Sequence, residues 1–132
     1  TFQGLATSAQ YADLAERYTS DTIYEPGTVV SFGGDAEVTM STETMDSRIA
    51  GVVSTNPAYL MNSDLENGVA IALTGRVPVK VMGTIRKGDM LVAAGEGYAK
   101  AEANPRMGSV IGKALEDFNG TNGIIEVVVG RL

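Results

Sequence analysis

The chain has 132 residues, of which 44% are apolar, and this length and composition suit one compact domain. It contains no Cys, no His and no Trp, which excludes thiol chemistry, disulfides, Cys/His zinc sites and catalysis by imidazole. The net charge of −6 is a poor match for nucleic acid or an anionic membrane, and no apolar run approaches the roughly 20 residues that span a bilayer. We therefore expect no nucleic-acid partner, no membrane insertion, no cofactor and no metal ion.

A short helix is predicted near the N-terminus, over residues 8–18. Such a helix is too short to be stable alone in water, so its apolar stripe must dock on its own domain or on a neighbouring chain. Residues 1–24 are therefore expected to form an N-terminal segment ahead of a single β domain at residues 25–132. The stripe consists of four residues spaced i, i+3, i+4 and i+7, which share one helix face: Tyr11, Leu14, Ala15 and Tyr18.

After Asp21 the sequence changes to short β-rich runs separated by Gly, Asn-Gly and Pro-Gly turns. Gly33-Gly34 and Gly95-Glu96-Gly97 lie between such runs and predict hairpin tips. Pro78 cannot donate to a ladder, so its strand should lie at an edge or begin there. The predicted strands are Thr28–Phe32, Glu37–Met40, Arg48–Ser54, Val69–Leu73, Val77–Met82, Met90–Ala93, Tyr98–Ala101, Ser109–Leu115 and Ile124–Val129.

The β-rich region contains an internal repeat with an offset of 61 residues. Each copy reads as a Gly-led strand, a Gly hairpin, a polar strand, an apolar strand with a central Gly, and a final apolar strand. Three matches carry the likeness: Pro26–Val30 on Lys87–Leu91, Gly51 on Gly112 and, with one deletion, Ile71–Val77 on Glu126–Leu132.

The predicted fold class is mainly β, with one short N-terminal helix. Residues 25–77 and 86–132 form two halves related by a pseudo-two-fold, in a small barrel or sandwich. We expect the halves to close this body together, because neither is expected to bury a core alone.

The first half carries an insert, residues 55–67, that contains Tyr59, Leu60 and Met61. Its counterpart in the second half, residues 116–123, is shorter and polar. The insert is too apolar for a bare solvent loop. It either caps one end of the barrel or packs against another subunit, and both alternatives stay open.

Without His or Cys, the candidate catalytic groups are a hydroxyl and two carboxylates. Asp13 and Glu16 are spaced i, i+3 on the predicted helix, just after Ser8. A hydroxyl followed by a carboxylate pair could support proton transfer and attack on the backbone. The same spacing is typical of the solvated face of a docked helix, and spacing alone favours that plainer interpretation.

Six stretches follow one another in an order that identifies a resemblance: Ala12–Glu16, Glu25–Val30, Ile49–Pro57, Leu73–Val79, Lys87–Leu91 and Val110–Glu116. Together they resemble the C-terminal domains of tailed-phage tail fibres, tailspikes and neck appendages. The resemblance covers nearly the whole chain, from about residue 8 to residue 132. Each stretch alone is a weak signal, and the set is fairly specific.

The resemblance implies a virion structural protein of a bacteriophage, made in the host cytoplasm and located in the tail or an appendage. It implies a homotrimer at the end of a fibre, with preceding fibre or shaft domains as neighbours and a host surface receptor as a candidate partner for attachment. Some members are intramolecular chaperones that cut themselves off near an Asp-x-Ala-Glu segment. Carried over here, the cleaving groups are Ser8, Asp13 and Glu16, although the aromatic residues that follow that segment in cleaving members are absent. The first residue is Thr1, so we expect a piece or processed product of a longer protein.

Three functions are thus predicted. The first is a trimer-forming structural module, and the second is a self-cleaving chaperone domain. The third is a receptor- or glycan-binding tip that uses exposed rings, for which Tyr59 and Tyr98 are the candidates. For the trimer, the expected interface residues are Tyr11, Leu14, Tyr18, Tyr59, Leu60 and Met61.

Overall fold

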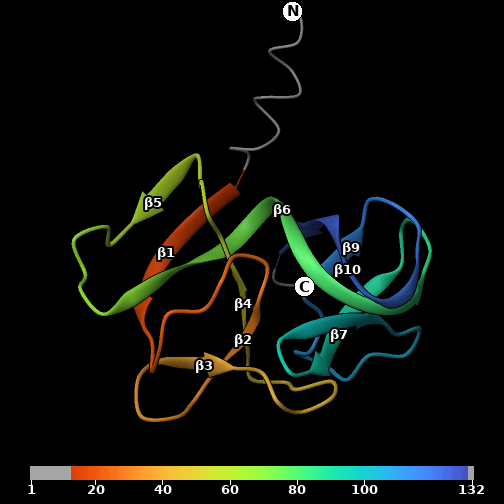
Figure 1. Ribbon diagram of the computed structural model, residues 1–132, viewed down its shortest axis with the longest axis horizontal. Helices are drawn as coiled ribbons and strands as arrows, with labels where there is room; N and C mark the ends of the chain where they lie inside the picture. Colours follow the sequence, from red (N-terminus) through yellow and green to blue (C-terminus); the bar gives the residue numbers. More distant parts are fainter. Residues whose placement is uncertain (1–12, 131–132) are drawn as a thin grey trace, which may run out of the picture.

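The structure is a computed structural model and describes residues 13–130. Every regular element in this range is a strand, which confirms the mainly β fold class. Figure 1 shows the strands gathered into two lobes, with β6 running from one to the other. The strands are β1 (Asp13–Thr19), β2 (Val29–Phe32), β3 (Val38–Met40), β4 (Ile49–Val53), β5 (Tyr59–Met61), β6 (Gly68–Ile85), β7 (Met90–Gly95), β8 (Tyr98–Ala101), β9 (Gly112–Ala114) and β10 (Phe118–Val129).

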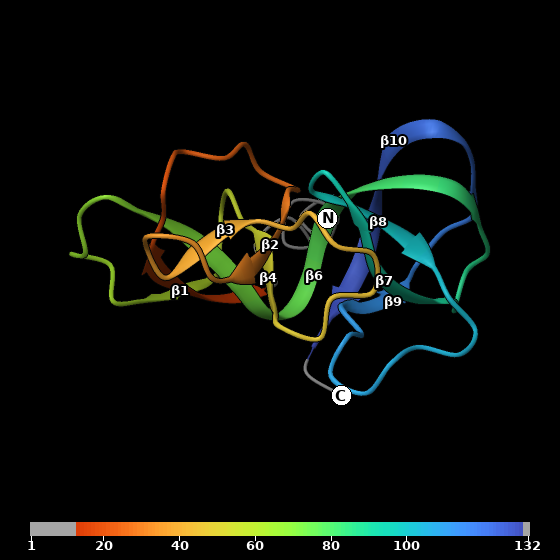
Figure 2. The same cartoon turned by 90° about the horizontal axis from the view of Figure 1, so that it is seen from below.

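Strand β6 is 18 residues long and belongs to both lobes. Its first part pairs with β1 and β4, and its second part pairs with β10 and, through Val81 and Ala99, with β8. We therefore call residues 13–73 the first half and residues 74–130 the second half. Figure 2 shows β1 to β4 on one side of the molecule and β7 to β10 on the other.

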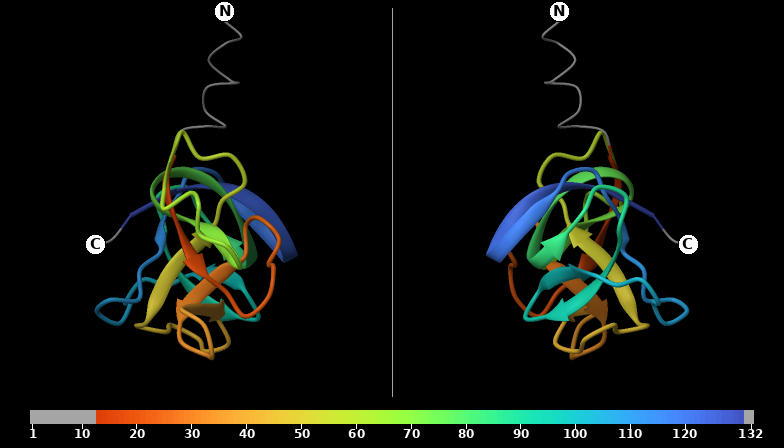
Figure 3. Two further views of the ribbon diagram at one scale, coloured as in Figure 1. Left: turned by 90° about the vertical axis from the view of Figure 1, so that its left-hand side faces the viewer. Right: turned by 90° about the vertical axis from the view of Figure 1, so that its right-hand side faces the viewer.

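Each half forms a five-stranded barrel. In the second half the order β10-β9-β7-β8-β6 is closed by the pairing of β10 with β6. In the first half the corresponding order is β6-β4-β2-β3-β1, in which β1 pairs back with β6. A bridge between Ser20 and Val38 joins β3 to the end of β1 and closes the ring. Seen from its two ends, the molecule shows strands curling around a centre (Figure 3).

The pairing registers of the two halves follow the 61-residue offset. Adding 61 to the residue numbers turns all three β2–β3 pairs, and two of the three β2–β4 pairs, into pairs of the second half. This holds for the hairpin, for the strand that follows it and for the closing bridge. The pairs Val30–Met40, Val30–Gly51 and Ser20–Val38 recur as Leu91–Ala101, Leu91–Gly112 and Val81–Ala99.

The last strand of the repeat is aligned one residue differently from the sequence match. The ladders pair Val53 with Ile71 and Ala114 with Val127, so Ile71 corresponds to Val127 and not to Glu126. Side chains alternate between the two faces of a strand, so a slip of one residue would exchange the buried and outer faces. Ile71 and Val127 are both fully buried, which agrees with the corrected register.

The predicted N-terminal helix is wrong for residues 13–18, which lie in β1. Ser8 and Tyr11 lie outside the described residues. Strand β1 pairs with β5 and β6, so the β structure includes residues ahead of position 25. β1 pairs with the first part of β6 in the same way as the second part of β6 pairs with β10. Strand β1 is therefore the first-half counterpart of the second part of β6. The repeat therefore starts one strand earlier than the sequence match did.

Each half buries its own core. The smaller hydrophobic cluster lies in the first half, and the larger one fills the second half and extends into the first through Val29, Val52 and Ala72. The predicted small barrel or sandwich is confirmed, with two hydrophobic clusters that these three residues join. Every buried member of the smaller cluster has a counterpart in the larger: Val30 and Leu91, Val38 and Ala99, Ala50 and Ile111, Val53 and Ala114, Val69 and Ile125, Ile71 and Val127.

Candidate functional site

The two predicted catalytic carboxylates are not brought together. Asp13 is buried, with 3% of its surface exposed, whereas Glu16 is half-buried on the other face of β1. This follows from strand geometry, because residues an odd number of positions apart point to opposite faces. Ser8, the predicted nucleophile, lies outside the described residues.

Asp13 is nevertheless an unusual group. Burial raises the pKa of its carboxyl, and a hydrogen bond with the Ser54 side chain offsets this effect in part. Its Oδ2 atom has no hydrogen-bond partner within residues 13–130. A carboxylate in this position weakens the fold when it is ionised.

The predicted interface residues on the first strand contact their own chain. Tyr18 packs edge-on against Phe32, with ring centroids 5.5 Å apart, and its hydroxyl donates to Glu16 Oε1 at 3.2 Å. Leu14 is half-buried and lies in register with Tyr59 of β5. Tyr11 lies outside the described residues, so its role at an interface stays a prediction.

The insert packs along its own first half. Strand β5, Tyr59–Met61, pairs in parallel with β1, and the Arg17 guanidinium donates to the carbonyls of Leu65 and Gly68, both at 2.9 Å. Leu60 and Met61 are half-buried, whereas Tyr59 is 65% exposed. The insert therefore packs along the edge of β1 in its own chain, while Tyr59 remains accessible.

The two candidate tyrosine rings do not form one platform. Tyr59 lies on β5 in the first half, and Tyr98 begins β8 in the second half. Tyr98 is half-buried, and Lys80 Nζ lies over its ring, 5.8 Å from the centroid. A role of either ring in glycan binding stays a prediction.

The second half packs on one face of the first half, which we call the covered face. Val29 N donates to Gly97 O at 2.8 Å, Gly97 N donates to Ser41 O at 3.0 Å, and Lys80 N donates to Gly27 O at 3.0 Å. Apart from the half-buried Met40, the residues of this face are buried. The covered face consists of Gly27, Thr28, Val29, Met40, Ser41, Val52 and Ala72.

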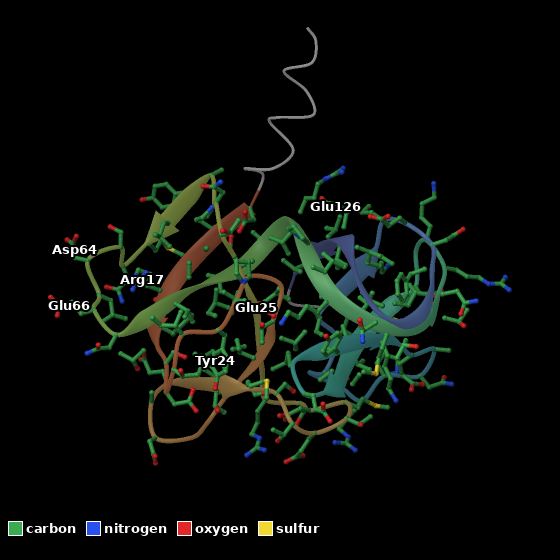
Figure 4. All side chains as sticks on the ribbon, in the orientation of Figure 1. Arg17, Tyr24, Glu25, Asp64, Glu66 and Glu126 are labelled. Carbon is green, nitrogen blue, oxygen red and sulfur yellow. The ribbon has the colours of Figure 1, made fainter. Side chains whose placement is uncertain are left out.

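An ion pair reinforces this contact. Lys80 of the second half pairs with Glu25 of the first half, and the Lys80 side chain is only 16% exposed. Figure 4 shows Glu25 near the middle of the molecule, close to where the two lobes meet. A pair with one partner largely removed from water is screened less by salt than a fully exposed pair.

The corresponding face of the second half is uncovered, and we call it the open face. Its residues line two adjoining grooves of about 480 and 660 Å³ that have Gly88 and Lys113 in common. Val128 is 44% exposed, whereas its counterpart Ala72 is 1% exposed. The open face consists of Gly88, Asp89, Met90, Ala101, Glu102, Lys113 and Val128.

The contact between the halves is not reciprocal, which corrects the expected pseudo-two-fold. A two-fold axis would turn the Lys80–Gly27 contact into a second contact between Thr19 and Gly88. Instead, Thr19 N donates to Glu37 Oε1 at 2.8 Å, and a Cβ placed on Gly88 would meet nothing within 4 Å. The halves therefore pack head to tail, and this packing leaves one face of the repeat unused.

Sequence reasoning missed the open face, although the sequence holds a signal for it. At the 61-residue offset, Val52 becomes Lys113 and Ser41 becomes Glu102, while the strands around them keep their apolar positions. A charge at a matched position indicates that the covering layer has changed.

Within residues 13–130 no group of three or more acidic side chains is placed to hold a metal ion. Over the same residues no helix has the length and apolar character needed to cross a membrane.

No protein-family model matches the chain, and no curated protein matches its sequence. Among solved structures, it is similar to the head fibre gp8.5 N base of bacteriophage phi29, with 15% identity and a TM-score of 0.49. The alignment covers 89% of this chain and 96% of that chain. A likeness at this level does not support a conclusion about the function of the present chain.

Proposed function

We propose that the chain is a structural, trimer-forming module of a phage fibre or appendage. The sequence resemblance to fibre and appendage domains supports this function, since it extends over nearly the whole chain. The observation that carries the oligomer is the open face, because the same face is an internal interface in the first half. Obligate oligomers bury such surfaces against their own copies.

The oligomeric state tests the first part of the proposal. Light scattering coupled to size exclusion should yield about three times the 13.8 kDa of one chain at micromolar concentration. A mass of one chain under these conditions would contradict the trimer.

The location in a particle tests the second part. In a phage that encodes this chain, mass spectrometry of gradient-purified particles should detect its peptides in a fixed ratio to the other structural proteins. Peptides found in the infected-cell lysate and lost from the purified particles would contradict a structural role in the virion.

A further inference from the structure

We propose that the open face of the second half binds the first half of another copy of this chain, through the β2–β3 tip at residues 33–37. Copies then associate head to tail, as the two halves do within one chain. This inference deepens the proposed function, on which its oligomer rests, by naming the two surfaces that meet.

The template for this contact exists inside the molecule. The tip between β7 and β8 sits on the covered face, where Gly97 exchanges backbone hydrogen bonds with Val29 and Ser41. A Cβ placed on Gly97 would lie 2.9 Å from Thr28 Cγ2 and 3.2 Å from Met40 Cγ. The covered face thus holds a hairpin tip by close backbone contact.

Both parts of a second such contact are available on each chain. In the first half the equivalent tip runs from Gly33 to Glu37, and all its residues are exposed except the half-buried Ala36, the counterpart of Gly97. In the second half the equivalent face is the open face. Since each chain holds one free tip and one open face, the contact can form only between copies.

Charges support the same pairing. Inside the chain Lys80 pairs with Glu25. At the 61-residue offset, Glu25 beside the covered face becomes Arg86 beside the open face, while Lys80 corresponds to Thr19, whose N–H donates to Glu37. A basic residue thus replaces an acidic one beside the open face, and Glu37, held next to the uncharged counterpart of Lys80, can pair with Arg86 of the next copy.

Strand β5 limits the contact to the tip. It covers the edge of β1 along residues 14–16, and the second half has no such strand on β6. The contact between copies therefore involves the tip and Thr19, not the whole edge of β1. A head-to-tail contact of this kind closes into a ring when its rotation allows, and three copies in a ring make the proposed trimer.

Cross-linking tests the contact directly, because the chain contains no Cys of its own. The contact between Gly97 and Met40 corresponds to a contact between Ala36 of one copy and Ala101 of the next. Two differently tagged chains, Ala36→Cys and Ala101→Cys, are mixed and mildly oxidised. We expect a disulfide-linked heterodimer to form about 10-fold faster than with the control mixture of Ala36→Cys and Ile124→Cys.

A second set of variants tests the face in the absence of cross-links. Val128→Lys places a charge on the open face, beside the proposed contact, and should weaken association about 10-fold or more. Ile124→Lys is the matched control, because Ile124 is a 61% exposed residue of the same strand outside the open face. Glu37→Arg should also weaken association, and Arg86→Glu in the same chain should restore it.

The outcomes separate this inference from the proposed function. A trimer that forms normally with Val128→Lys and shows no Ala36–Ala101 cross-link would overturn the inference and leave the trimeric module standing. A wild-type chain that remains a monomer would overturn both. Cross-linking at the Ala36–Ala101 pair above the control, with weakened assembly of Val128→Lys, supports both.

Discussion

The covered face of the first half and the open face of the second half have the same backbone and different residues. Val52 is fully buried, and its counterpart Lys113 is exposed. Ser41 is fully buried, and its counterpart Glu102 is half-buried. The two faces have the same strand registers, so these differences arise from what covers each face and not from the strands themselves. In a repeated fold, the residues that change character between copies therefore mark the surfaces whose surroundings differ.

The difference between the two faces is tested most directly by exchanging the residue types at the matched positions 52 and 113. Val52→Lys buries an unpaired ammonium between the halves and should lower the free energy of unfolding by about 4 kcal/mol. Lys113→Val should change it by no more than about 0.5 kcal/mol, since position 113 is exposed within one chain. Urea unfolding of both variants, at concentrations where the chain is monomeric, checks the contrast. Similar small effects at both positions would contradict the tight packing of the halves.

A second test uses a feature that the two halves have in common, the matched glycines Gly51 of β4 and Gly112 of β9. A Cβ on Gly112 would lie 2.1 Å from Val128 O, and a Cβ on Gly51 would lie 2.7 Å from Ala72 O. Because backbone atoms must move, Gly112→Ala should cost about 3 kcal/mol and Gly51→Ala somewhat less. Gly83→Ala is the control, because nothing lies within 4 Å of its Cβ and only its φ of +86° opposes a side chain. It should cost about 1 kcal/mol in the same unfolding experiment.

The repeat could be predicted because its signals are local. Turn glycines and apolar alternation determined the strand polarity, and the 61-residue offset holds in every ladder of the hairpin and central strand. The sequence match aligned the final strand of the two halves one residue away from the alignment in the structure. The insert changes the offset between the halves from 61 to 56 residues, and the match placed this change one residue off. Burial parity, which pairs Ile71 with Val127, would have corrected it.

Strand β1 could not be read from its own periodicity. Leu14 and Tyr18 fit one face of a helix, and they fit equally one face of a strand that alternates with Ala15 and Arg17. The tertiary context decides, because β6 offers a free edge to pair with. The signal that could have revealed it was the repeat itself, since residues 16–20 fall on Val77–Val81, a predicted strand.

The open face was missed for a different reason. Its existence depends on how two barrels pack, and head-to-tail packing yields the same local patterns as two-fold packing. The two arrangements differ in whether the contacts between the halves are reciprocal. Here Lys80 contacts Gly27, whereas the matching residue Thr19 binds Glu37 and not Gly88.

A smaller effect is expected where a buried acid in the first half has an exposed counterpart in the second half. Asp46 is 4% exposed and accepts hydrogen bonds from Ser31 Oγ and from Arg48 N, both at 2.9 Å, whereas its counterpart Met107 is 93% exposed. Burial opposes ionisation, but these hydrogen bonds and the Arg48 charge outweigh it and lower the pKa of Asp46.

Asp46→Asn should therefore cost about 2 kcal/mol at pH 7. In the wild type, this contribution is present above pH 3.8 and is lost as the pH falls through the lowered pKa, because the unfolded chain then binds the proton first. The gap between wild type and variant should thus narrow in acid, as followed by urea unfolding at several pH values. Met107→Ser, at the equivalent exposed position, should change stability by less than about 0.5 kcal/mol. A gap that stays constant down to pH 2 would contradict the ionised, hydrogen-bonded Asp46.

The smallest effect is expected at the first residue of the repeat, and its sign is reversed. Asp13 is buried, while its counterpart Thr74 is exposed, and burial raises the pKa of the Asp13 carboxyl. The folded chain then holds the proton more tightly than the unfolded chain, so the stabilising protonated form is present below pH 3.8 and is lost as the pH rises through the raised pKa. Asp13→Asn removes this loss of stability and should stabilise the chain by about 1 kcal/mol at pH 7, with no gain in acid.

Ser54→Ala provides a second measurement. Removal of the hydroxyl raises the pKa of Asp13 further, so the loss of stability between acid and pH 7 should become larger than in the wild type. The opposite result would be an Asp13→Asn chain that is less stable than the wild type at pH 7 and matches it in acid. It would show that the Asp13 carboxylate has a partner in solution. Asp13 and Asp46 should thus change the stability of one fold in opposite directions with pH, because desolvation outweighs the hydrogen bonds of Asp13, whereas the hydrogen bonds and the Arg48 charge outweigh it at Asp46.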